Sequence, residues 1–200
     1  MYSYRPNPSI YLFLVTVVLP CMSVVAQTKN EKEYIISKEN FPEVALLQLE
    51  NKLSSAKRIR YFKEYDNTQI GYEVKFKLEK MYHSVEFDSI GQLEDIETYI
   101  EEKDIPESTL QRVNNFLEEE FNTFRIIKIQ RQYTTEITKA PEALFQYAFN
   151  KDKNIGENYE IVIAGRDQED FENFELLFSS EGSLINKRKF ASIGYDHILY

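Results

Sequence analysis

The stretch Tyr72-Glu-Val-Lys-Phe76 alternates apolar and polar residues, and Tyr159-Glu-Ile-Val-Ile163 has the same alternation later in the chain. A period of two predicts antiparallel strands with one buried and one solvated face. Two further stretches also match, Phe87-Asp-Ser-Ile-Gly91-Gln-Leu93 and Phe178-Ser-Ser-Glu-Gly182-Ser-Leu184. Each places a glycine between alternating runs, which is typical of a hairpin. These matches indicate that one unit occurs twice in the chain.

A helix is predicted at the start of each unit. Pro42 and Pro106 are each followed by apolar residues at helical spacing, and proline is favoured at the first helical position. The helices should cover residues 42–54 and 106–122. The strands should cover residues 56–65, 70–78, 81–88 and 92–100 in the first unit, and 124–135, 158–165, 171–179 and 183–191 in the second. Consecutive strands joined by short turns must be antiparallel.

The predicted fold class is α+β, with two tandem modules that each pack one helix on a four-stranded antiparallel sheet. The modules would be residues 27–103 and 104–200. The second would carry an insertion at about 136–157 that contains a short helix over Pro141–Phe149. The sheet face opposite each helix would be open to a partner, and insertions of this length often carry function.

The N-terminus is typical of a signal peptide. The apolar run Ile10–Leu19 is shorter than a bilayer span, and small residues lead to a predicted cleavage site after Ala26. We therefore expect residues 1–26 to be removed, leaving a periplasmic or secreted protein without a transmembrane span. The single cysteine, Cys21, lies in this segment, so the mature chain would form no disulfide. Acylation of Cys21 in a lipoprotein is the alternative, and Pro20 before it argues against that alternative.

Composition excludes several function classes. The formal charge of −9 and the absence of a basic block disfavour nucleic-acid binding. His83 and His197 are far apart, so the sequence predicts neither a zinc site nor any other metal or cofactor. The segment Asn150–Asn158 resembles a calcium loop but has isoleucine at both the glycine and the glutamate positions of an EF-hand. No catalytic motif is present, and we predict that the protein is not an enzyme.

The order of these segments resembles the PepSY-like family of exported bacterial proteins, also described as β-lactamase-inhibitor-like. The residues that carry the resemblance are Phe41-Pro42, Tyr72–Phe76, Val85–Asp88, Gly91-Gln-Leu93, Asp104-Ile-Pro106 and Gly182-Ser-Leu184. The resemblance covers about residues 41–191 and implies tandem helix-plus-sheet modules with a non-enzymatic role. The family's usual tryptophan is missing, because the chain contains none.

The leading functional hypothesis is recognition of a protein or peptide, or inhibition of an enzyme, through the open sheet face. Tyrosine and phenylalanine are favoured in interface centres. The predicted partner-binding residues are Tyr61, Tyr82, Tyr99, Tyr133, Phe145, Tyr147 and Phe149. The partner would be an unidentified protein or peptide of the cell envelope. A carrier or sensor with an apolar pocket for a small ligand is the alternative. A hydrolytic enzyme would require ionisable groups held together in a cleft.

Overall fold

The computed structural model describes residues 27–29, 31–136, 138, 140–149, 157–166 and 170–190. Within these residues, ten strands form one sheet in the order β1-β10-β9-β8-β7-β6-β5-β4-β3-β2. The strands are β1 (Gln27–Lys29), β2 (Glu31–Ile36), β3 (Lys57–Asp66), β4 (Gln69–Leu78), β5 (Met81–Phe87), β6 (Leu93–Tyr99), β7 (Thr123–Thr134), β8 (Asn158–Arg166), β9 (Phe171–Phe178) and β10 (Leu184–Phe190). The helices are α1 (Glu43–Leu49), α2 (Glu107–Glu120) and α3 (Pro141–Phe149), with short 3-10 turns at Lys38–Asn40 and Glu102–Asp104.

The prediction of two modules, each with its own four-stranded sheet, is wrong. β6 pairs with β7 from Asp95 opposite Thr134 to Tyr99 opposite Gln130, so a single sheet runs through both halves of the chain. Its described strands pair antiparallel except for β1, which is parallel to β10. Pairing these two strands satisfies backbone groups that would otherwise be exposed at two sheet edges. The sequence contains no turn motif that predicts this pairing, because the whole of α2 lies between the two strands.

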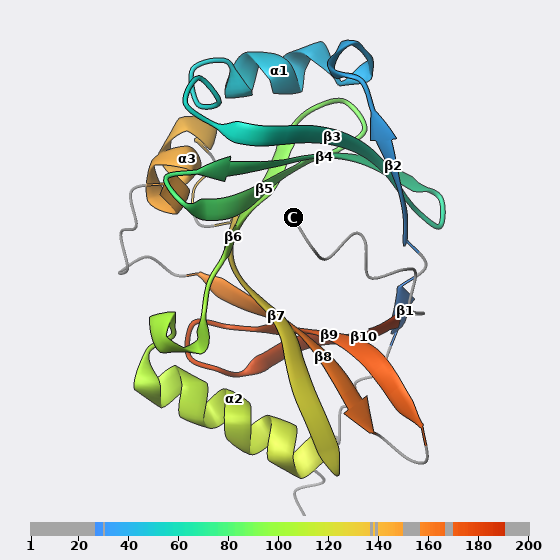
Figure 1. The fold of residues 1–200 in the computed structure, drawn as a ribbon, viewed down its shortest axis with the longest axis vertical. Coiled ribbons are helices and arrows are strands. Elements are labelled where there is room, and N and C mark those ends of the chain that lie inside the picture. Colours follow the sequence, from blue (N-terminus) through green and yellow to red (C-terminus); the bar gives the residue numbers. More distant parts are fainter. Residues whose placement is uncertain are drawn as a thin grey trace, which may run out of the picture.

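Figure 1 shows α1 and α2 on the outer side of the curved sheet, and an apolar core lies under each helix. Ala45 and Leu49 of α1 pack with Val74, Phe76 and Val85 of the sheet. A second core forms under α2 at the other end. Its members include Val113, Leu117, Ile161, Ile163 and Phe174, each at most 1% exposed. The predicted cover of one sheet face by an amphipathic helix is therefore present in both halves.

The predicted insertion forms α3, and this helix packs on the core of the first half. Leu144, Phe145 and Ala148 are buried in the same cluster as Phe76, beside Tyr133 of β7. Figure 1 shows α3 beside β5 and β6, on the same side of the sheet as α1. The helix therefore serves as part of the core, although the sequence assigned it to the second module.

The two glycine turns have the same geometry. Gly91 and Gly182 have φ values of +83° and +81°, a conformation that favours glycine. The amide of each donates to a carbonyl three residues earlier, Asp88 or Ser179. A Cβ on Gly182 would lie 2.8 Å from the carbonyl oxygen of Thr109, so this turn sits tightly against α2.

The sheet curls until its two edge strands approach each other. β1 and β2 are the outermost strands at opposite ends of the strand order, yet one residue, Asn30, separates them in sequence. The Cα atoms of Lys29 and Glu31 can therefore be at most about 7.6 Å apart. The inner side of the sheet, called the concave face below, is consequently partly enclosed rather than openly solvated (Figure 1).

A buried ion pair lies between the two cores. Arg131 of β7 places its Nε 3.0 Å from Oε1 of Glu157, and both side chains are almost completely buried. The Tyr159 hydroxyl donates to the same oxygen at 2.8 Å, and Arg131 also donates to the carbonyl of Asp104 at 2.8 Å. These contacts connect β7, β8 and the turn that precedes α2.

None of the described helices is both long and apolar enough to span a bilayer. The predicted signal peptide at residues 1–26, including Cys21, lies outside the described residues.

Candidate functional site

Polar residues of the central strands line the concave face. In β4, Val74 and Phe76 point into the core while Glu73 and Lys75 occupy the alternate positions. The same alternation continues across the sheet, because Glu73 lies opposite Glu86 in β5. Charged residues on this face are largely buried even so, since the sheet curls around them.

A hollow of about 600 Å³ opens on the concave face. We call it the acidic hollow because eight of its fifteen lining residues are acidic and Arg188 is the one basic residue among them. The acidic residues are Glu64, Asp66, Glu86, Asp88, Glu94, Asp95, Glu97 and Glu160.

Three carboxyl groups meet at the base of the hollow. Glu86 comes from β5, and Asp95 and Glu97 come from β6. Asp95 lies opposite Glu86 in the strand pairing, and one oxygen from each of the three residues lies within 4.8 Å of the others. The Glu97 side chain is 4% exposed. The sheet register therefore concentrates negative charge where little water reaches it.

Asp95 shows the electrostatic consequence most clearly. Burial, followed by the charges of Glu160 and Glu94, raises the pKa of Asp95 from 3.8 to about 8. Gln132 opposes the rise by donating to Oδ2 at 3.0 Å. The other oxygen, Oδ1, is buried and has no hydrogen-bond partner among the described residues. Folding therefore favours the protonated form of this side chain.

The pKa of Glu97 is also raised well above its usual value, first by burial and then by the charges of Glu160 and Asp95. Lys128 opposes the rise and lies 3.3 Å from a carboxylate oxygen of Glu160. The Lys128 ammonium group therefore acts on more than one carboxyl at the base of the hollow.

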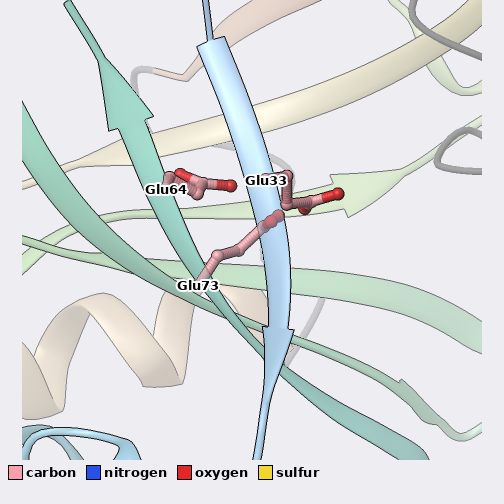
Figure 2. Close-up of side chains that lie close together, drawn as sticks. All are labelled: Glu33, Glu64 and Glu73. Atoms are coloured by element: carbon pink, nitrogen blue, oxygen red, sulfur yellow. The ribbon is translucent and has the colours of Figure 1, made fainter.

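A second carboxyl cluster, formed by Glu33, Glu64 and Glu73, lies farther toward β2 (Figure 2). Lys75 forms ion pairs with both Glu33 and Glu73, and Ser84 donates to Glu73. Burial and the neighbouring Glu73 raise the pKa of Glu33 to about 7. Burial alone would raise the pKa of Glu73, but Lys75 and the hydrogen bonds to Glu73 outweigh it and lower that pKa. This cluster therefore already contains its own cation.

Two of the predicted partner-binding residues lie on the concave face. Tyr99 alternates with Glu97 along β6 and is 39% exposed. Tyr82 alternates with Ser84 in β5, accepts a hydrogen bond from Arg58 at 2.8 Å and lies under the ammonium of Lys77. Both therefore lie on the sheet face opposite the helices.

The other five predicted residues lie on the helix-covered side. Tyr133 and Phe145 are 1% and 2% exposed, so they belong to the core and offer no surface to a partner. Tyr61, Tyr147 and Phe149 are partly buried against the same core. Amphipathic spacing could not distinguish a core aromatic from an interface aromatic here, since α3 packs inward.

His83 is a buried residue of the covered face. Its ring stacks on Phe76 with centroids 5.5 Å apart, and Nδ1 lies 3.0 Å from the Thr98 hydroxyl. His197 and residues 150–156 of the calcium-like segment lie outside the described residues.

The carboxyl clusters were missed because their members are spread over separate strands. In sequence, Glu86 and Asp95 occupy ordinary polar positions of alternating strands, which predicts a solvated face. They stand almost symmetrically about the Gly91 turn, however, so pairing the strands across that turn would have brought them together. The burial of both followed from the curl of the sheet, which no local pattern encodes.

The fold is shared with solved structures of low sequence identity. A DUF2874 family protein from Bacteroides ovatus has 12% identity and a TM-score of 0.51, and the match covers 80% of this chain and 99% of that one. A putative periplasmic protein from Bacteroides eggerthii has 12% identity and a TM-score of 0.52, with 78% and 94% covered. A BLIP-like protein from Bacteroides fragilis matches at 14% identity and a TM-score of 0.47, with 78% and 91% covered.

No protein-family model matches the sequence, and the search of curated proteins returned no match. The matches with TM-scores of 0.51 and 0.52 show the fold alone. The predicted resemblance to the PepSY-like, β-lactamase-inhibitor-like family stays a prediction.

Proposed function

We propose that this chain is a non-enzymatic periplasmic binding protein that recognises a protein or peptide through its concave face. The observation that carries the proposal is the acidic hollow, in which eight carboxyl side chains face a single arginine. Such a surface is complementary to lysine and arginine side chains of a partner. A periplasmic location is supported by the predicted signal peptide and by the name of the Bacteroides eggerthii neighbour.

The partner's cationic side chains would enter from the rim. Glu94 is exposed there, and Asp66 is partly exposed on the neighbouring wall. Tyr99, which is 39% exposed, offers apolar contact area on the same face. Charged rim contacts set specificity and association rate, while the apolar contacts add buried area.

A defined peptide tests this proposal. Residues 27–200 are titrated in EDTA into a fluorescein-labelled peptide of alternating lysine and glycine, and into a matched glutamate peptide, with anisotropy as the readout. We expect the lysine peptide to bind and its affinity to fall with salt. The double variant Asp66→Asn and Glu94→Gln should weaken binding by roughly 2–30-fold, because exposed ion pairs contribute about 0.2–1 kcal/mol each.

The matched control is Glu118→Gln, an exposed acid on α2 at the outer surface. Equal binding of both peptides, or an equal loss in the Glu118→Gln variant, would overturn the proposal. Mass spectrometry of the peptide after incubation tests the enzymatic alternative, since raised carboxyl pKa values are also what a general acid requires. Cleavage of the peptide would replace the binding role by a hydrolytic one.

The volume of the hollow favours one second candidate, a carrier or sensor for a small ligand. At about 600 Å³ the hollow is large enough for a small molecule, but its lining is acidic rather than apolar. The ligand would therefore be a small polycation. Spermidine that competes with the lysine peptide and binds more tightly than it would favour this candidate.

A further inference from the structure

We propose that Val44, Leu47 and Ile90 form an apolar docking patch for the same basic segment that enters the acidic hollow. The three side chains are called the apolar patch below. The inference rests on the proposed function and deepens it, because the partner segment then carries apolar side chains next to its lysines or arginines.

The apolar patch lies where α1 meets the turn between β5 and β6. Val44 and Leu47 are three residues apart in α1, so they share one face of the helix, and they are 45% and 66% exposed. Ile90 precedes Gly91 in the turn and is 67% exposed. A Cβ on Gly91 would lie 3.3 Å from the Cβ of Val44, so the turn packs directly on the helix. Gln48 joins the two, since its Nε2 donates to the carbonyl oxygen of Gly91 at 2.9 Å and to that of Val44 at 3.2 Å.

The second half of the chain provides an internal comparison. Its turn at Gly182 packs on α2 in the same way, since a Cβ there would lie 2.8 Å from the carbonyl oxygen of Thr109. The residues that correspond to the apolar patch in that half are Ser108, Gln111 and Glu181, all of which are exposed. The packing of a helix on this turn therefore does not require apolar side chains at these positions. A group of exposed apolar side chains that the fold does not need is typical of an interaction surface.

The apolar patch adjoins the acidic hollow through the same turn. Asp88 and Ser89 line the hollow, and Ile90 follows them directly in sequence. The amide of Gly91 donates to the carbonyl of Asp88 at 3.0 Å, so the turn is tight. An extended peptide advances about 3.3 Å per residue. A few residues of one partner segment can therefore connect the hollow to the patch.

The charge around the apolar patch selects a basic partner. Residues 42–50 and 88–94 include Glu43, Asp88 and Glu94 but no lysine or arginine. This acidic border would repel anionic lipid headgroups, and the chain's formal charge of −9 disfavours a second copy of the chain as the occupant. A segment that combines cationic and apolar side chains is complementary to both the border and the patch.

Peptides with and without an apolar end test the inference. The lysine–glycine peptide described above is compared with two versions that carry leucine-phenylalanine-leucine at one end or the other, joined by four glycine and serine residues. A neutral serine–glycine peptide with the same apolar end completes the set, and anisotropy with residues 27–200 is again the readout. We expect the apolar end, in one of the two orientations, to raise the affinity of the lysine peptide at least about 5-fold, because fully burying one leucine side chain favours binding by about 10-fold or more. The neutral peptide should bind more weakly than the plain lysine peptide.

The test variants copy the second half of the chain. Val44→Ser and Leu47→Gln, combined in one protein called the patch variant, give α1 the side chains found at positions 108 and 111 of α2 without changing the charge. The patch variant should lose the affinity gained from the apolar end but should bind the plain lysine peptide like the parent chain. Phe171→Gln, at a side chain in β9 that is 56% exposed, is the matched control and should keep the gain. Circular dichroism shows that each variant is folded.

The outcomes separate this inference from the proposed function. An apolar end that adds nothing to the affinity, or a gain that persists in the patch variant, would overturn the inference and leave the proposed function standing. Failure of every lysine peptide to bind would overturn the proposed function and this inference together. Dimerisation measured by sedimentation, or binding to vesicles of phosphatidylcholine and phosphatidylglycerol, would also overturn the inference if the patch variant abolished it, because the patch would then have a different occupant.

Discussion

The protonation of Asp95 predicts how stability depends on pH. Its pKa is raised from 3.8 to about 8 in the folded chain, mainly by burial and by the charge of Glu160. Below about pH 4 both the folded and the unfolded chain hold this proton. As pH rises from about 4 to 8, the unfolded chain loses the proton while the folded chain retains it. Stability contributed by this group therefore falls across that window and levels off above pH 8.

The size of the effect follows from the proton difference. One proton held by the folded chain alone changes stability by about 1.4 kcal/mol per pH unit, or about 4 kcal/mol between pH 5 and pH 8. Glu97 and Glu160 share the electrostatic repulsion, so the proton is partly distributed among the carboxyls. We therefore expect Asp95 to account for about 2–3 kcal/mol of lost stability over this range.

Urea unfolding of residues 27–200 at pH 5, 6.5 and 8, in EDTA, measures the effect. The Asp95→Asn variant keeps an acceptor for Gln132 but has no proton to lose. The unfolding free energy of this variant should depend less on pH than that of the parent chain, and it should be higher than that of the parent chain at pH 8. Glu119→Gln removes an exposed carboxyl on α2 and should show the same pH dependence of the unfolding free energy as the parent chain. Parallel stability curves for the parent chain and Asp95→Asn between pH 5 and pH 8 would refute the reasoning.

Three further predictions concern the fold. Arg131→Met leaves buried Glu157 without its ion-pair partner and should cost about 3–5 kcal/mol in urea unfolding, while the added change Glu157→Gln should recover at least half; no recovery would contradict the pairing. Gly182 has a φ of +81°, and a Cβ there would lie 2.8 Å from the carbonyl oxygen of Thr109 in α2. Gly182→Ala should therefore lower the free energy of unfolding by roughly 2 kcal/mol, whereas Ser183→Ala should change it little. Phe145→Ala empties a site that is 2% exposed and should cost about 3–5 kcal/mol; a cost below 1 kcal/mol would show that α3 is not part of the core.

The local elements could be predicted from the sequence because each has a local cause. Alternation predicted a strand over 70–78, and β4 spans Gln69–Leu78. The helix expected over Pro141–Phe149 is α3. The helix expected over 42–54 ends early, since α1 spans only Glu43–Leu49. β2 was not predicted at all, because Glu31–Ile36 carries charged residues among its apolar ones and lies at a sheet edge.

The arrangement of the elements required information that no local pattern contains. Pairing of β6 with β7 joins segments on either side of α2, and the meeting of the sheet's edges follows from the strand order as a whole. The same limit applies to the site residues. Tyr99 and Tyr133 look alike in sequence, yet one is 39% exposed on the concave face and the other is 1% exposed in the core. A shift of one residue in a strand exchanges these two environments.

The acidic hollow links stability to binding. A chain selected for stability alone would gain by replacing Asp95 and Glu97 with neutral residues, because burying an unpaired carboxylate is costly. A ligand that binds only the folded chain raises the free energy of unfolding, and the increase grows with the logarithm of the ligand concentration divided by its dissociation constant. Carboxyls that destabilise the empty protein at neutral pH therefore become stabilising contacts once a partner's cationic side chains occupy the hollow. The curl of the sheet that buries Asp95 and Glu97, and so raises their pKa values, also forms the hollow in which they could meet such a partner.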